Sequence, residues 1–139
     1  FDKKWMKPFA EALKENGVIH AFIVHSEDGM DEISPFAKTN VVELKDSIIK
    51  EFIIDPKTLG IDSVNKENLK GKNAEYNSEK IIEIFKGKIN EFSQSVALNA
   101  AAGLIVSGKE SDFKTSYEKA TKHLNSGKVF DHLVKIQSN

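Results

Sequence analysis

The chain has 139 residues, 40% of them hydrophobic and 29% charged, which is enough for one globular domain with a core of its own. Its formal net charge is −1, so the composition gives no general affinity for nucleic acid or anionic membranes, and no apolar run approaches the roughly 20 residues that cross a bilayer. The absence of cysteine excludes disulfides and thiolate chemistry, and we expect a cytoplasmic protein.

The N-terminal segment predicts a helix over residues 2–16. Apolar residues recur there near helical spacing from Trp5 onward, and Gly17 supplies the left-handed residue that ends many helices. Pro8 should kink this helix or delay its regular start, because proline has no backbone N–H to donate. The chain begins with Phe1 and enters the helix at once, so we expect a preceding part of a longer protein.

The most informative stretch is an apolar, β-prone run over residues 18–25 that breaks into an acidic loop containing Gly29, Asp31 and Glu32. If the run is a strand buried in a parallel sheet, the loop leaves from its C-terminal end, where open α/β sheets place their ligand crevice. Adjacent carboxylates can hold Mg²⁺ there, with water and substrate phosphates completing its ligand shell. Asp31 and Glu32 therefore predict a magnesium site for a phosphorylated substrate.

The alternative interpretation of Asp31 and Glu32 is an acidic, solvated loop that caps a following turn. Glu27 and Asp28 add charge nearby and could either support a metal site or simply be solvated. The four histidines show no spacing typical of metal ligands. His25, at the end of the predicted strand, could hydrogen-bond in the loop or serve a purely structural role.

Two further apolar runs, residues 40–45 and 48–54, are separated only by residues 46–47. This two-residue connection favours a β-hairpin, although a glycine in the turn is the more usual signal. Residues 57–61 predict one short helical turn. The polar segment over residues 62–77 predicts an ordered surface loop.

The remaining chain predicts four helices, over residues 78–86, residues 92–106, a segment capped by Ser111 that runs to residue 125, and residues 129–136. The helix over residues 92–106 is nearly all apolar or small, so we expect it to be buried on most sides. A buried amide needs partners, so Asn99 should tie this helix to neighbouring backbone. Gly108 and Gly127 follow helices and do not fit the spacing of a phosphate loop, which makes them helix ends.

Together these elements predict an α/β fold in a single domain over residues 1–139. We expect the C-terminal part of a mostly parallel sheet, flanked by helices and carrying one β-hairpin. If upstream strands lie outside this chain, a sheet edge or an apolar face should be left uncovered. Such a surface invites association with another chain.

In order and spacing, these segments resemble the C-terminal part of the anthranilate phosphoribosyltransferase family over nearly the whole chain. The resemblance is carried by the helix over residues 8–14 with Gly17, Val24-His25 with residues 28–34, residues 56–61, residues 69–71 leading to Asn77, residues 98–103, and the Ser-Gly turn before the last helix. The chain departs from the family pattern at Ser26 and Lys72, where glycine is common, and at Met30, where leucine is common. None of these departures involves the carboxylate pair.

The resemblance implies a glycosyltransferase of tryptophan biosynthesis that joins anthranilate to phosphoribosyl pyrophosphate and releases pyrophosphate. It implies that Asp31 and Glu32 bind the Mg²⁺ that accompanies the pyrophosphate. It further implies that the glycine-rich phosphate loop, the anthranilate-binding arginine and the helical N-terminal domain that forms the homodimer all lie upstream of this segment. On this basis the 139 residues alone should be inactive.

Two other readings of the sequence stay open. One stays among related folds and is a pyrimidine nucleoside phosphorylase or a non-biosynthetic relative of the transferase; the carboxylate pair favours pyrophosphate chemistry. The other is a binding module that has lost catalysis. Its signature would be weak Mg²⁺ binding in the absence of a partner.

Overall fold

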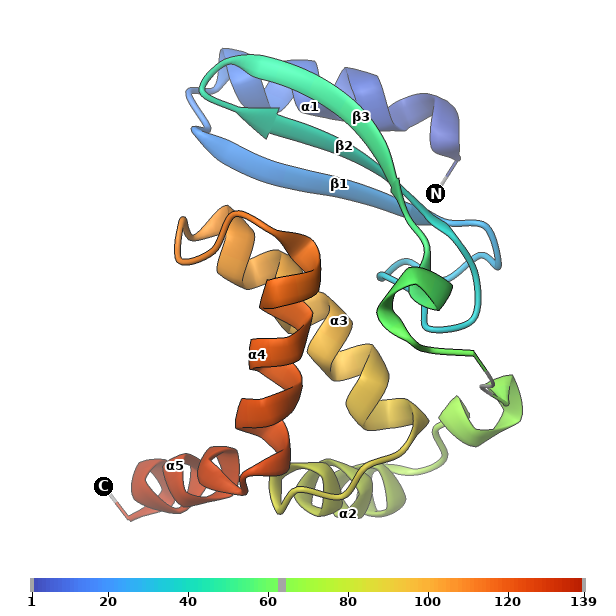
Figure 1. Ribbon diagram of the computed structural model, residues 1–139, viewed down its shortest axis with the longest axis vertical. Helices are drawn as coiled ribbons and strands as arrows, with labels where there is room; N and C mark the ends of the chain where they lie inside the picture. The colour runs from blue at the N-terminus through green and yellow to red at the C-terminus, as the bar shows by residue number, and fades with distance from the viewer. Residues whose placement is uncertain (1, 63–64, 139) are drawn as a thin grey trace.

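The computed structural model describes residues 2–62 and 65–138, and in these residues a small sheet lies between two layers of helices (Figure 1). The sheet consists of β1 (His20–Ser26), β2 (Thr39–Lys45) and β3 (Ile48–Ile54), in the order β1-β2-β3. Helix α1 (Met6–Glu15) packs on one face. Helices α3 (Glu91–Val106) and α4 (Phe113–Asn125) lie on the other side, and α2 (Ala74–Phe85) and α5 (Lys128–Gln137) lie farther from the sheet (Figure 1).

The N-terminal helix confirms the prediction for this segment, with a delayed regular start. A 3-10 turn (Lys3–Trp5), capped by the Asp2 carboxylate, precedes α1. Pro8 therefore lies in the first turn of α1, where backbone N–H groups have no intrahelical acceptor and proline costs little. Gly17, with φ of 77°, ends the helix in the left-handed region as expected.

The expected mostly parallel sheet is not what the described residues form, because both strand pairings are antiparallel. After the acidic loop the chain returns directly alongside β1 as β2, with Ser26 opposite Thr39. A continuous apolar run is typical of a parallel strand covered on both faces. Strand β1 is also covered on both faces, with Phe22 and Val24 packed against one apolar cluster and Ile23 against the other, so its run indicated this coverage and not the direction of pairing. The α/β class itself is confirmed.

The hairpin between β2 and β3 is confirmed. Asp46 and Ser47 have φ of 49° and 65°, which is the backbone of a type I′ turn. Asp and other short polar residues tolerate this region, so the turn forms without glycine. After β3, Asp55 caps the short turn Pro56–Leu59, and Gly60 ends it with φ of 79°.

The predicted surface loop over residues 62–77 is partly wrong. It contains a 3-10 turn (Lys66–Leu69), and α2 begins at Ala74 instead of Ser78; residues 63–64 lie outside the described part. The Asn73 side chain accepts a hydrogen bond from the Tyr76 N–H and so starts the helix early. The first turn of α2 shows no apolar periodicity, so the sequence pattern did not indicate that the helix begins there. Helix α4 is similarly capped by Asp112 and not by Ser111.

Two apolar clusters hold the layers together. Between the sheet and α3 lies the larger one, formed by the buried side chains of Ile33, Val41, Ile54, Ile61 and Leu98. Met6, Ala10 and Val42 form the other, between the sheet and α1. Helix α3 is less buried than expected. Its buried residues are Ser93, Ser95, Ala97, Leu98, Ala101 and Ile105, most of the others are half-buried, and its flank at Val96, Ala100 and Gly103 is exposed. None of the helices among the described residues is long and apolar enough to cross a membrane.

Candidate metal-binding loop

The acidic loop over residues 27–38 connects β1 to β2 and is closed at its base. The Glu27 N–H donates to the Lys38 carbonyl at 2.9 Å, which continues the strand pairing one step past Ser26. The Gly29 N–H donates to the Ser26 carbonyl at 3.1 Å, in a turn that puts Gly29 at a φ of 84°. The loop therefore starts with a defined turn, and its two ends are held together by the sheet.

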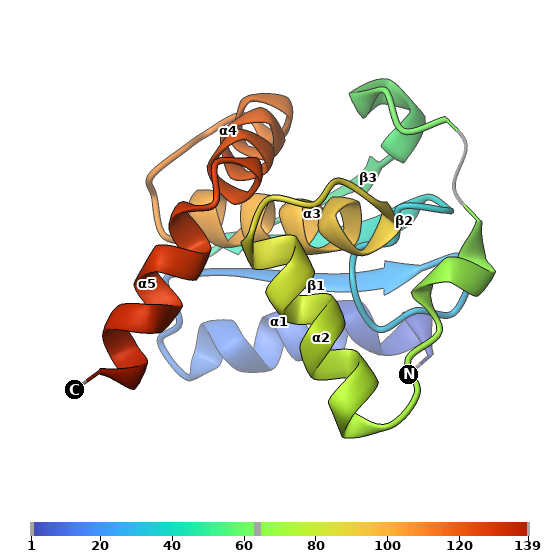
Figure 2. The ribbon, with the colours of Figure 1, turned by 90° about the horizontal axis from the view of Figure 1, so that it is seen from below.

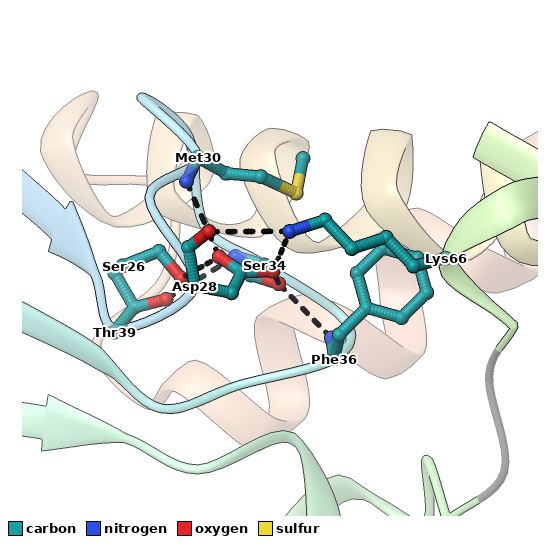
Figure 3. A network of polar contacts seen from close by, with 7 residues as sticks. All are labelled: Ser26, Asp28, Met30, Ser34, Phe36, Thr39 and Lys66. Atoms are coloured by element: carbon teal, nitrogen blue, oxygen red, sulfur yellow. Dashed lines mark hydrogen bonds and ion pairs between the residues drawn. The ribbon is translucent and has the colours of Figure 1, made fainter. Parts of the chain in front are cut away.

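The Asp28 carboxylate organises the first half of this loop (Figure 3). It accepts hydrogen bonds from the Ser26 hydroxyl at 2.6 Å, the Met30 N–H at 3.2 Å and the Ser34 hydroxyl at 2.9 Å. The Lys66 ammonium lies 3.6 Å from the same carboxylate and donates to the Asp28 carbonyl at 3.1 Å. The Asp28 side chain thus joins the end of β1, two points of the loop and a distant turn.

The electrostatics of Asp28 follow from these contacts. Burial by itself raises the pKa of this carboxyl, but the hydrogen bonds from Ser26, the Met30 N–H and Ser34, together with the Lys66 charge, outweigh burial and lower the pKa below its ordinary value. Asp28 is therefore ionised at neutral pH. Its ionised form, with four donors around it, stabilises the folded loop.

We expect the free energy of unfolding to fall as the pH drops below about 4, because the unfolded chain then binds a proton at Asp28 that the folded chain does not. Asp28→Asn should lower stability at pH 7 by roughly 1–3 kcal/mol and flatten this pH dependence. Urea unfolding of both proteins between pH 3 and 7 measures the difference. If the free energy of unfolding changed with pH equally in the wild type and in Asp28→Asn, the role of Asp28 would be contradicted. The other acids with lowered pKa are the same in both proteins: Asp2, Glu83, Glu91 and Asp112.

The second half of the loop is tied to α3. The Ile33 N–H donates to the Asn99 side-chain oxygen at 3.0 Å, and the Asn99 amide nitrogen donates to the Ile33 carbonyl at 3.1 Å. The Ile33 side chain is buried in the cluster beside Leu98. The prediction that Asn99 ties its helix to neighbouring backbone is confirmed.

Asp31 and Glu32 lie between these two anchors, and both are exposed. Among the described residues neither carboxylate accepts a hydrogen bond or pairs with a cation, and no group of three or more acidic or histidine side chains in that part of the chain could hold a metal ion. Two carboxylates on an anchored backbone fit an ion that takes its other ligands from water and phosphate oxygens, as Mg²⁺ does.

The other candidates occupy structural positions. Gly108 and Gly127 follow α3 and α4 with φ of 71° and 77°, which confirms them as helix ends. His25 lies within β1, and its carbonyl accepts from the Asn40 amide at 3.4 Å. A functional role for its ring stays a prediction.

Sequence reasoning missed the part played by Asp28, Ser34 and Lys66. A local signal was present: an Asp followed by Gly, with a serine two residues before, is typical of a turn in which the carboxylate accepts from the N–H two residues on. The contact with Lys66 joins residues 38 positions apart, and no local pattern indicates it.

Comparisons with known proteins give a consistent result. Residues 1–130 match the model of the glycosyl transferase family, a/b domain. An anthranilate phosphoribosyltransferase from Pelagibacter ubique is 52% identical over 138 residues, which are 99% of this chain and 42% of the relative. One from Methanosarcina acetivorans is 41% identical over 129 residues, which are 93% of this chain and 35% of the relative.

Solved structures agree in fold. The anthranilate phosphoribosyltransferase of Thermus thermophilus superposes with a TM-score of 0.86 at 30% identity, over 97% of this chain and 40% of that one. The Saccharomyces cerevisiae enzyme, solved in complex with phosphoribosyl pyrophosphate and Mg, gives 0.81 at 24% identity, over 94% of this chain and 38% of that one. The chain thus spans about two fifths of the length of these relatives.

Proposed function

Because this chain belongs to the glycosyl transferase family whose a/b domain it matches, we propose that it forms the metal-binding part of an anthranilate phosphoribosyltransferase. That enzyme transfers the phosphoribosyl group from phosphoribosyl pyrophosphate to anthranilate, a step of tryptophan biosynthesis. The observation that carries the proposal is the exposed pair Asp31–Glu32 on a loop anchored at both ends, in a chain 52% identical to a segment of such an enzyme.

The proposed role of the pair follows from the charges of the reaction. As the bond between C1 of the ribose and the pyrophosphate oxygen breaks, positive charge builds on the sugar and negative charge on the departing group. Mg²⁺ held at this loop would offset the negative charge. Asp31 and Glu32 contribute carboxylate oxygens as ligands, and the anchored backbone keeps those oxygens in place before the substrate arrives.

The rest of the reaction is assigned to the part of the longer protein outside this chain. Phosphate binding, anthranilate binding and the homodimer interface belong there, as the family resemblance implies. The parallel strands of the sheet belong there as well, and the anthranilate amine, already a nucleophile, needs mainly positioning from that part. The 139 residues by themselves should therefore bind metal weakly and catalyse nothing. We also place the protein in the cytoplasm.

A segment exchange tests this proposal. The matching segment of the Pelagibacter ubique relative is replaced by this chain, and the loss of anthranilate fluorescence is followed with Mg²⁺ and phosphoribosyl pyrophosphate. We expect kcat/KM within about tenfold of the unmodified relative, a difference of ~1.4 kcal/mol in transition-state stabilisation. A folded chimera without turnover would count against the assignment. Turnover by the 139 residues alone would refute their proposed dependence on the remaining part.

A further inference from the structure

We propose that Asn99 is the positioning residue of the carboxylate pair: it fixes the backbone at Ile33 so that Asp31 and Glu32 are held ready for the metal–pyrophosphate group. The inference rests on the proposed function. Asn99 lies on α3, 66 residues away from Ile33 in sequence, and belongs to the helix layer, not to the loop. It does not itself reach the reacting atoms; it acts through the loop backbone.

The hydrogen bonds of Asn99 leave the side chain one orientation. Its oxygen accepts from the Ile33 N–H at 3.0 Å, and its nitrogen donates to the Ile33 carbonyl at 3.1 Å and to the Ser95 carbonyl at 2.9 Å. Rotating the amide by half a turn would set its donors against an N–H and its oxygen against two carbonyls. Because both polar groups of Ile33 are bonded to one side chain, the loop backbone is fixed there as it would be by a neighbouring strand.

The side chain of Ile33 supports the same attachment. It is 1% exposed and packs in one cluster with Leu98, the residue before Asn99. At the other end of the pair, the Met30 N–H is held by Asp28 at 3.2 Å. Asp31 and Glu32 are thus the only residues between two fixed backbone points. Ligands fixed before binding avoid the ordering cost that flexible carboxylates incur when an ion arrives.

The test uses the 139-residue chain with Mn²⁺ and inorganic pyrophosphate as probes. Paramagnetic broadening of the amide NMR signals of residues 30–33 gives an apparent Kd. We expect saturable broadening in the wild type, and about tenfold weaker binding in Asn99→Ala, equivalent to ~1.4 kcal/mol. Asn99→Asp keeps the acceptor for the Ile33 N–H but loses both amide donors, and it should also bind more weakly than the wild type.

Asn90→Ala is the matched control. Asn90 caps the same helix, accepting from the Ser93 N–H at 2.9 Å, so its removal weakens α3 without touching the loop. Its Kd should stay within twofold of the wild type. An Asn99→Ala protein that is folded and binds as tightly as the Asn90→Ala control would overturn the proposal.

Backbone relaxation separates this inference from the proposed function. In Asn99→Ala the order parameters at Asp31 and Glu32 should fall from about 0.85 toward 0.6, whether or not metal is present. A wild-type chain that shows no saturable broadening would contradict the proposed metal site. Unchanged order parameters in Asn99→Ala would contradict the positioning role, whatever the metal does.

Discussion

Replacing Asp31 and Glu32 together by Asn and Gln is expected to lower kcat/KM of the chimera by roughly a thousandfold. Metal ions contribute several kcal/mol to the stabilisation of charge in such transition states, and each ~1.4 kcal/mol lost slows the reaction tenfold. Both side chains are exposed, so the change should leave the fold intact. The measurement is anthranilate consumption over a range of Mg²⁺ concentrations.

Glu27→Gln is the matched control for this effect. Glu27 is an exposed acid of the same loop, and its backbone N–H, which closes the loop, survives the substitution. It removes one negative charge close to the site but no proposed ligand, and we expect kcat/KM within threefold of the parent chimera. If the double variant also keeps kcat/KM within threefold of the parent chimera, the loop does not hold the metal. If Glu27→Gln is equally damaging, the loop acts through its total charge and not through two defined ligands.

The elements that depend on local chemistry could be predicted from the sequence. The first helix with its stop at Gly17 and the hairpin closed at Asp46–Ser47 each follow from residues a few positions apart. The strand pairing could not be predicted in the same way. The run that became β1 is apolar on both faces, and its direction relative to its neighbour depends on where the chain returns, at Thr39, after a loop of twelve residues.

The same distinction between local patterns and long-range contacts applies to the candidate site. The carboxylates of Asp31 and Glu32 could be singled out from the sequence, because two adjacent acids after a strand are a local pattern. The contacts that anchor these two residues could not be predicted from the sequence, apart from the general expectation that Asn99 ties its helix to neighbouring backbone. That residue meets the loop across 66 positions, and Lys66 meets Asp28 across 38. Contacts of this kind come from the packing of α3 and the 3-10 turn against the loop, which only the folded structure shows.

We expect the isolated chain to self-associate through the side of the molecule at β1. Among the described residues, β2 is the only strand paired with β1, whose other edge is open. β1 contains no lysine, proline or acidic residue of the kind that protects open edges, whereas β3, at the opposite edge, carries Lys50 and Glu51. Light scattering after size-exclusion chromatography should therefore show dimers or larger species whose share rises with concentration.

Apolar residues lie on this side of the molecule both next to β1 and in the helix layer below the sheet. Lys7 of α1 pairs with Glu51 of β3 at 2.7 Å, and Figure 2 shows α1 extending past β1 on the side away from β3. Trp5, the residue before α1, is 51% exposed. Ile19, just before β1, is 71% exposed. Below the sheet, an open groove of about 390 Å³ runs between β1 and α3, and its apolar lining includes Phe22, Val24, Ala102, Gly103 and Val106. Exposed apolar side chains beside an open strand edge are typical of a surface that another chain segment covers.

Charges placed on this surface should suppress the association. Ile19→Lys changes an exposed side chain, and Gly103→Lys adds one where a Cβ meets nothing within 4 Å, so neither should harm the fold. Together they should weaken self-association at least tenfold, ~1.4 kcal/mol. Ile136→Lys, at a 60% exposed position on α5, is the control and should leave it unchanged. A wild-type chain that stays monomeric over a wide concentration range would contradict the prediction. In the chimera the association should disappear even without these substitutions, because there the remaining part of the longer protein would cover the open edge of β1.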